Sequence, residues 1–289
     1  MNRILDFRFS IFDFRLCRAG CSNRKSKIEN RKWPWLLALG SLLLAAACAE
    51  EPGPAHKGEG TKGTKEAYVA ASKRGGEQGG DLVKTGQFYF PRLQFQCHED
   101  VPDKWDVHPI GDQNLREQIK KLTNINILAE PVVVNLDRME EMCRYPFVFM
   151  TAEGTFTFSD SNMATVREYL QRGGFIYGDD CVLFGKGELF FKAFVAQMNR
   201  VFPDNPMRPI PADHEIFSIF FKLDGFPHMQ GVKHPGMGLF DKETGRLMAM
   251  CTSGDLHCGW VGYVHQFGES NRQKAFQMGV NIVVYCLTH

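Results

Sequence analysis

Carboxyl, imidazole and thiol side chains gather in four short clusters, each directly after a segment whose pattern predicts a strand. The first begins at Cys97-His98-Glu99-Asp100, the second is Thr151–Gly154, the third is Gly178–Cys181 and the fourth is Ser253–Trp260. In parallel sheets, ligands collect outside the carboxyl ends of the strands, so we expect the four clusters to face one crevice. These residue types offer acid–base chemistry or ligands for a hard cation.

Asp179 and Asp180 carry the sharpest of these hypotheses. Adjacent strand residues point to opposite faces, so we expect one carboxylate to enter the crevice and the other to cap the following segment. As a functional pair they could hold a hard cation or act as general base. The alternative is structural: a carboxylate that accepts hydrogen bonds from the backbone at the end of the strand.

His98 and His257 could join one of these carboxylates as ligands or as acid and base, although a single loop histidine is more often an ordinary surface residue. The candidate catalytic residues are therefore Asp179, Asp180, His98 and His257. No close His-x-x-x-His or Cys-x-x-Cys pair and no cofactor motif occurs, so the sequence predicts no particular metal or cofactor.

Five further residues are candidates for binding: Trp105, Glu153, His214, Asp255 and Trp260. Either tryptophan could stack on a planar ligand, and core packing explains both equally well. His214 follows a proline-rich approach and precedes Ile216-Phe217, which predicts that it starts a helix.

The spacing of apolar residues predicts an alternation of strands and helices. Strands are expected at 88–95, 131–136, 145–150 and 175–177, and helices at 114–122, from Ser159 to Gly173, at 189–201 and at 271–287. This alternation predicts an α/β sheet that is mostly parallel and carries helices on both faces.

The amino-terminal part predicts export. Arg31-Lys32, a short apolar run and Ala45-Ala46-Ala47-Cys48 have the three parts of a secretory signal, which ends either in a lipoprotein cysteine at Cys48 or at an ordinary signal-peptidase site. The remaining alternative is an uncleaved or non-signal segment. The basic region of a signal is usually much shorter than the 30 residues found here, which indicates a translation start placed too early.

Residues 49–86 are poor in large apolar side chains and are expected to be a flexible tether, and residues 87–289 are expected to form a single domain. We expect an exported protein of the cell envelope or periplasm, in contact with the membrane through this anchor or signal only.

The charges support this division. The chain has 34 Lys+Arg and 33 Asp+Glu, but residues 1–48 contain nine basic and three acidic residues, which leaves 25 and 30 in 49–289. The mature part therefore carries a net charge of −5, and no basic region is present to hold a nucleic-acid backbone.

Five motifs resemble one bacterial family, the domain of unknown function numbered 4159. They are Arg92-Leu93-Gln94, Tyr145-Pro146-Phe147, Gly173–Cys181, Asp213–Phe217 and Gly254–Trp260. The resemblance implies a flavodoxin-like three-layer α/β sandwich related to the class I glutamine amidotransferases, with no established activity. Those enzymes flank their nucleophilic cysteine with small residues two positions away. Cys181 has Asp179 and Leu183 there, so we expect a buried, unreactive thiol.

Two functions follow as hypotheses. The first is an envelope-tethered domain that binds a small molecule or an envelope protein without amidotransferase activity. The alternative is a hydrolase, metal-assisted or not, that acts on a carbohydrate or amide through an Asp/His site at the strand ends.

The domain has six cysteines, and in an oxidising compartment Cys251 and Cys258 could form a disulfide.

Overall fold

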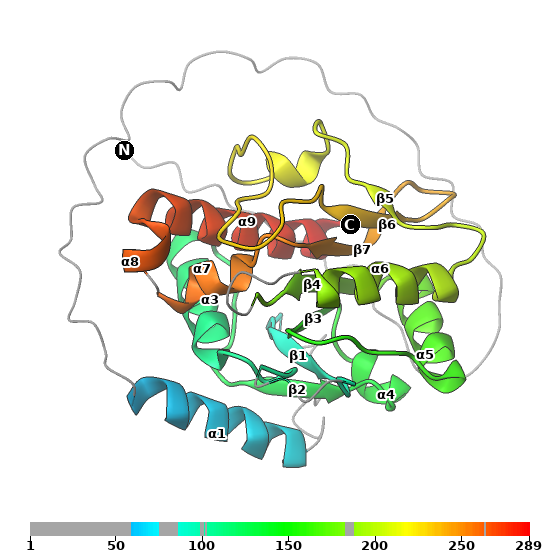
Figure 1. The fold of residues 1–289 in the computed structure, drawn as a ribbon, viewed down its shortest axis with the longest axis horizontal. Coiled ribbons are helices and arrows are strands. Elements are labelled where there is room, and N and C mark those ends of the chain that lie inside the picture. Colours follow the sequence, from blue (N-terminus) through cyan, green and yellow to red (C-terminus); the bar gives the residue numbers. More distant parts are fainter. Residues whose placement is uncertain (1–58, 75–85, 99–100, 102, 183–187, 263) are drawn as a thin grey trace.

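A seven-stranded sheet forms the centre of the computed structural model, which describes residues 59–74, 86–98, 101, 103–182, 188–262 and 264–289. Its order is β2-β1-β3-β4-β7-β6-β5 (Figure 1). The strands are β1 Pro91–Gln94, β2 Val132–Asn135, β3 Phe147–Ala152, β4 Phe175–Asp180, β5 Arg208–Pro209, β6 Met237–Phe240 and β7 Leu247–Thr252. The first five in this order are parallel, and β6 and β5 are antiparallel to their neighbours. The predicted α/β class with a mostly parallel sheet is confirmed.

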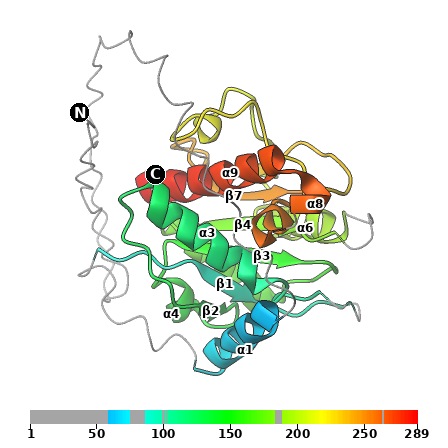
Figure 2. The same ribbon diagram turned by 90° about the vertical axis from the view of Figure 1, so that its left-hand side faces the viewer.

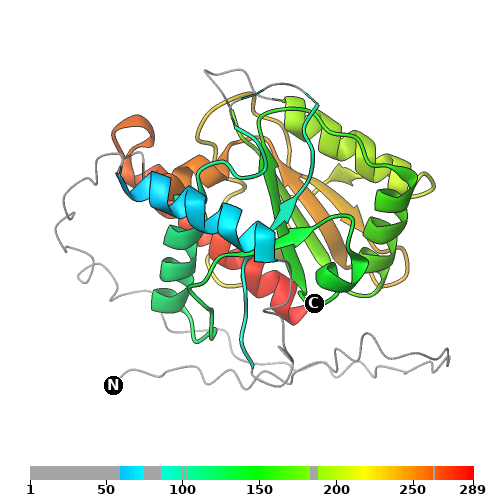
Figure 3. The same cartoon turned by 90° about the horizontal axis from the view of Figure 1, so that it is seen from below.

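Helices cover both faces of the sheet, as the strand–helix alternation predicted (Figure 3). One face carries α3 (Pro109–Leu122), α7 (Leu256–Val261) and α9 (Glu269–Thr288), and the other carries α4 (Met139–Met142), α5 (Asp160–Gln171) and α6 (Leu189–Val201). The described elements also include the short α8 (Val264–Phe267) and the 3₁₀ turn η2 (Glu215–Phe217). This arrangement is consistent with a flavodoxin-like α/β sandwich.

The two central strands show why the sequence folds this way. Every residue of β3 and β4 is buried, which explains their continuous apolar runs. Their side chains alternate: Phe149 and Tyr177 pack with α3, α7 and α9, whereas Met150 and Ile176 pack with α5 and α6. Helix α5 begins at a capping box on Ser159, and the turn before β4 has Gly173 at φ 101°.

Two predicted elements have different bounds in the structure. Helix α3 begins at Pro109, five residues before the expected start, with proline in its first turn. The expected strand at 88–95 is shorter, because Phe88 forms only an isolated bridge with Ile127. The sequence analysis gave no residue range for β6 or for β7, although it expected a strand before the cluster at Ser253. β7 consists mainly of Leu, Met and Ala, which have no strong strand preference of their own.

The prediction of an unstructured tether over 49–86 is wrong for part of that range. Helix α1 (Glu59–Arg74) packs beside β2 and α3 (Figure 2). Tyr68 is fully buried there, and its hydroxyl donates to Asp112 Oδ2 over 2.8 Å and accepts from Arg116 Nη1 over 2.9 Å. The contacts of Tyr68 with buried polar partners hold this helix against the domain. The average composition of residues 49–86 does not reveal such a contact.

The predicted signal segment, Cys48 and residues 49–58 and 75–85 lie outside the described residues. Within the part of the chain that the structure describes, no helix is long and apolar enough to cross a membrane.

Candidate functional site

The carboxyl ends of β3, β4 and β7 bring the second, third and fourth polar clusters to one edge of the sheet. Thr151 is in register with Asp179, and Asp179 with Thr252. The helix that follows β7 starts directly at this edge, so α7 contributes His257 and Cys258 to it. Three of the four clusters that were expected to share one crevice therefore meet at this edge.

Asp179 has a structural role, because its side chain joins neighbouring elements of the fold. It is fully buried, and its Oδ1 accepts from Thr252 Oγ1 over 2.5 Å while its Oδ2 accepts from the His257 backbone N–H over 2.8 Å. Burial and the nearby charge of Asp255 raise the pKa of Asp179 well above its usual range, which the Thr252 and His257 hydrogen bonds counteract in part. Both carboxylate oxygens are thus committed to joining β4 to β7 and α7.

Asp180 points to the other face of the sheet, as expected for adjacent strand residues. Its Oδ2 accepts from the backbone N–H of Glu188 over 2.5 Å, at the start of α6, where a helix favours negative charge. Among the described residues, the buried Oδ1 has no hydrogen-bond partner. Burial raises the pKa of Asp180 to about 7, although backbone amides of Glu188, Phe191 and Phe190 lower it.

His257 belongs to a buried ion-pair cluster, which we call the Arg92–Asp112–His257 cluster. Its Nε2 lies 3.0 Å from Arg92 Nη2 and 3.1 Å from Asp112 Oδ1. Burial lowers the pKa of His257 to about 4, so the ring is neutral at pH 7. The close approach requires glycine at position 111, because a Cβ there would lie 2.8 Å from His257 Nε2.

Arg92 and Asp112 are completely buried at the centre of this cluster. Arg92 Nε donates to Asp112 Oδ2 over 3.0 Å, Nη2 pairs with Oδ1, and Nη1 donates to the carbonyls of Trp105 and Val107. Burial alone would raise the pKa of Asp112, but the charge of Arg92 and the hydrogen bond of His257 hold it below its usual range. The sequence analysis did not assign either residue to the site, although an arginine inside a predicted strand was a usable signal.

Two of the remaining candidates lie apart from this edge or within the core. His98 is exposed and pairs with Thr157 Oγ1 over 2.8 Å, and no hydrogen bond or ion pair joins it to Asp179, Asp180 or His257 among the described residues. Trp260 is fully buried and its indole N–H donates to the Ala275 carbonyl over 2.9 Å, so it is a core residue rather than a stacking platform.

Trp105 and His214 also have structural contacts. Trp105 is half-buried and packs against Tyr68 and its neighbours. His214 starts the 3₁₀ turn η2, where its Nδ1 accepts from the Ile216 N–H over 3.2 Å, which confirms the expected helix start.

Glu153 and Asp255 lie at the edge on the α7 side. Asp255 is fully buried and accepts from the backbone N–H of Val182 over 3.1 Å, from Gln230 Nε2 over 2.6 Å and from the Cys258 N–H over 3.3 Å. Glu153 is only 5% exposed, yet neither carboxylate oxygen has a hydrogen-bond partner in the described part of the chain. Burial, followed by the charge of Asp103, raises the pKa of Glu153.

The expected Cys251–Cys258 disulfide is absent, and all six cysteines of the described domain are free thiols. Cys251 packs in the core on the α5–α6 side of the sheet, whereas Cys258 lies on α7, on the opposite side. A bond between them would have to pass through the sheet.

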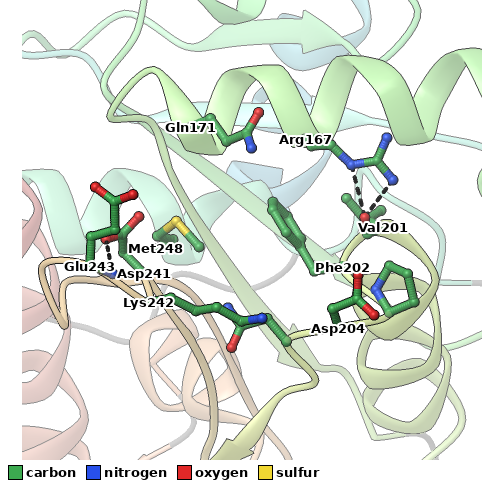
Figure 4. A pocket seen from close by; sticks show the side chains of 11 residues that line it. Arg167, Gln171, Val201, Phe202, Asp204, Asp241, Lys242, Glu243 and Met248 are labelled. Atoms are coloured by element: carbon green, nitrogen blue, oxygen red, sulfur yellow. Dashed lines mark hydrogen bonds between the residues drawn. The ribbon is translucent and has the colours of Figure 1, made fainter.

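A pocket of about 430 Å³ lies away from this edge (Figure 4). It is formed by the carboxyl-terminal ends of α5 and α6 and by the turn between β6 and β7, near the start of β7. Arg167 is already engaged there, since its Nε and Nη2 both donate to the carbonyl of Val201. Lys242 and Glu243 give the pocket charges of both signs, and nothing in it favours one kind of ligand.

Fold and edge together define a mostly parallel α/β domain with buried acidic groups at its strand ends. The chain belongs to the family described as Domain of unknown function (DUF4159), whose model matches residues 90–287. No curated protein matches the chain.

Proposed function

We propose that this protein is an exported, envelope-tethered domain that binds a small ligand or an envelope protein at the carboxyl edge of its sheet. One observation carries the proposal: the best acid–base candidates, Asp179 and His257, are fully buried and engaged in hydrogen bonds that hold the fold. In the described part of the chain, three buried carboxylate oxygens at this edge have no hydrogen-bond partner, namely both oxygens of Glu153 and Oδ1 of Asp180. Unsatisfied polar groups at strand ends are where a ligand gains most from binding.

Amidotransferase chemistry has no support at Cys181. The hydrogen bond with Cys258 and then burial raise the pKa of the Cys181 thiol well above its usual range. The nucleophile in such reactions is the thiolate, so this cysteine is a poor nucleophile at neutral pH. We therefore propose that the chain is related to the class I glutamine amidotransferases by its fold and does not share their activity.

The alternative is a hydrolase that uses Asp180. It is favoured by the buried Oδ1, which has no hydrogen-bond partner among the described residues, together with a pKa of about 7. Such an enzyme needs a second catalytic group within hydrogen-bond reach. Among the described residues, no hydrogen bond or ion pair joins the Asp180 side chain to His98 or His257. Substrate turnover that Asp180→Asn abolishes would replace the binding proposal with this alternative.

The tether is tested separately, through Cys48. In cells that process lipoproteins, we expect the wild-type protein in the membrane fraction and Cys48→Ala in the soluble fraction, because the variant lacks the thiol that would carry the lipid. Cys97→Ala is the matched control and should stay with the membrane. An exported Cys48→Ala protein that remains membrane-bound would show that lipidation is not the anchor.

A further inference from the structure

Two thiols and a carboxylate converge at the carboxyl end of β4. The Sγ atoms of Cys181 and Cys258 and a carboxylate oxygen of Asp255 all lie within 4.8 Å of one another. Cys181 directly follows β4, and Asp255 and Cys258 come from the start of α7. All three residues are buried, so the three atoms face one another in a space that is shielded from solvent.

Glu153 lies beside this group and is the independent observation that points to a ligand. β3 and β4 are in parallel register up to Ala152 and Asp180, and the Cys181 N–H donates to the Ala152 carbonyl, which places Glu153 next to Cys181. Glu153 also interacts electrostatically with Asp255. Glu153 is 5% exposed, and among the described residues neither of its carboxylate oxygens has a hydrogen-bond partner, which is a costly state unless a cation or donor binds it.

We propose that Cys181, Cys258 and Asp255 bind a divalent transition-metal ion of the zinc type, with Glu153 as an acidic neighbour outside the group of three ligands. Thiolates select borderline and soft ions over Mg²⁺ or Ca²⁺, and three ligands of the sulfur and oxygen type suit tetrahedral Zn²⁺ whose fourth position is open. Binding releases the two thiol protons to solvent, and the metal then replaces them as the positive partner of both sulfurs.

The surrounding residues already orient the central carboxylate. Gln230 Nε2 and the Val182 backbone N–H both donate to Asp255 Oδ2, at 2.6 Å and 3.1 Å. Hydrogen bonds of this kind fix the direction of a metal ligand, and their loss typically weakens metal affinity by about 10–100-fold. Gln230 is therefore a positioning residue for this centre, and it is half-buried rather than part of the core.

This metal centre does not require the proposed ligand or partner to bind, because its three ligands belong to one buried cluster, although Glu153 lies beside both sites. It also differs from the Asp/His hydrolase site of the sequence analysis, since neither histidine takes part. A metal here would hold β4 to α7 and could stabilise the edge whether or not anything else binds there.

The test is Co²⁺ titration of the reduced, chelator-treated full-length protein, followed by absorption spectroscopy, with bound Zn²⁺ counted by elemental analysis. We expect one ion per chain and a sulfur-to-cobalt charge-transfer band. Cys181→Ala and Cys258→Ala should lose the band, and Cys251→Ala, the matched control on the other face of the sheet, should keep it. Gln230→Ala should bind about 10–100-fold more weakly, and Glu153→Gln should weaken binding by about tenfold or more.

Circular dichroism of each variant separates loss of the site from loss of the fold. Folded wild-type protein that binds no stoichiometric metal, or that shows no charge-transfer band, overturns the proposal. Equal affinity in wild type, Gln230→Ala and Glu153→Gln, all folded, would also overturn it. The same holds if the isolated protein carries a Cys181–Cys258 disulfide and binds no metal after reduction.

Discussion

Arg92→Met is expected to lower the free energy of unfolding by about 3–5 kcal/mol, because it leaves the Asp112 carboxylate buried without its ion-pair partner. Three other groups would lose a partner as well, since Arg92 also contacts His257 and the carbonyls of Trp105 and Val107. Urea denaturation followed by circular dichroism measures the loss.

The pH dependence of this loss has a definite sign. Without Arg92, burial should raise the pKa of Asp112 above its value in the unfolded chain. The folded variant then binds a proton that the unfolded chain releases, so its stability is greatest at acidic pH and falls as the pH rises through the folded pKa. The difference between wild type and variant should therefore be larger at pH 8 than at pH 5.

Two comparisons show whether the ion pair itself is responsible. The double variant Arg92→Met/Asp112→Leu removes both charges and should be more stable than Arg92→Met alone. Arg208→Met, at an exposed arginine, should change stability by less than about 1 kcal/mol. A loss at Arg92 no larger than that at Arg208 would contradict a buried, structural cluster.

Trp260→Ala is expected to cost about 3–5 kcal/mol, because the indole is fully buried and packs against Phe90, Phe149 and Tyr177. The substitution also leaves the Ala275 carbonyl without the indole N–H. Thermal or urea unfolding gives the value directly. A tryptophan that served as a ligand platform would instead be replaceable with little loss of stability.

Trp105→Ala is the matched control for this prediction. Trp105 is half-buried at the margin of the α1 contact, so its replacement should cost clearly less than that of Trp260. Trp260→Phe should recover part of the loss by refilling the core. Equal destabilisation by Trp105→Ala and Trp260→Ala would contradict the assignment of Trp260 to the core.

The elements that could be predicted are those whose apolar pattern matches their burial. β3 and β4 are continuous apolar runs covered on both faces, and α5 has a capping box that is visible in the sequence. Their order along the chain was sufficient to place Asp179 and Glu153 at one edge of the sheet. No residue range was predicted for β7, because its fold depends on pairing with β4 rather than on the preferences of its own residues.

The roles of the site residues could not be predicted, since they depend on partners far away in sequence. His257 meets Arg92 across 165 positions and Asp112 across 145. A histidine in a loop looks available for catalysis until such contacts are known. Tyr68 shows the same limit, because a single buried anchor turned part of an apparent tether into a packed helix.

The central claim, that the strand-end edge binds rather than catalyses, is tested most directly by turnover. The full-length wild type, Asp180→Asn and the exposed control Asp213→Asn are incubated with p-nitrophenyl esters, p-nitroanilides and p-nitrophenyl glycosides, with and without added Zn²⁺. We predict that all three proteins release product no faster than buffer alone. Product release by wild type and Asp213→Asn that is lost in folded Asp180→Asn would contradict the account and establish a hydrolase.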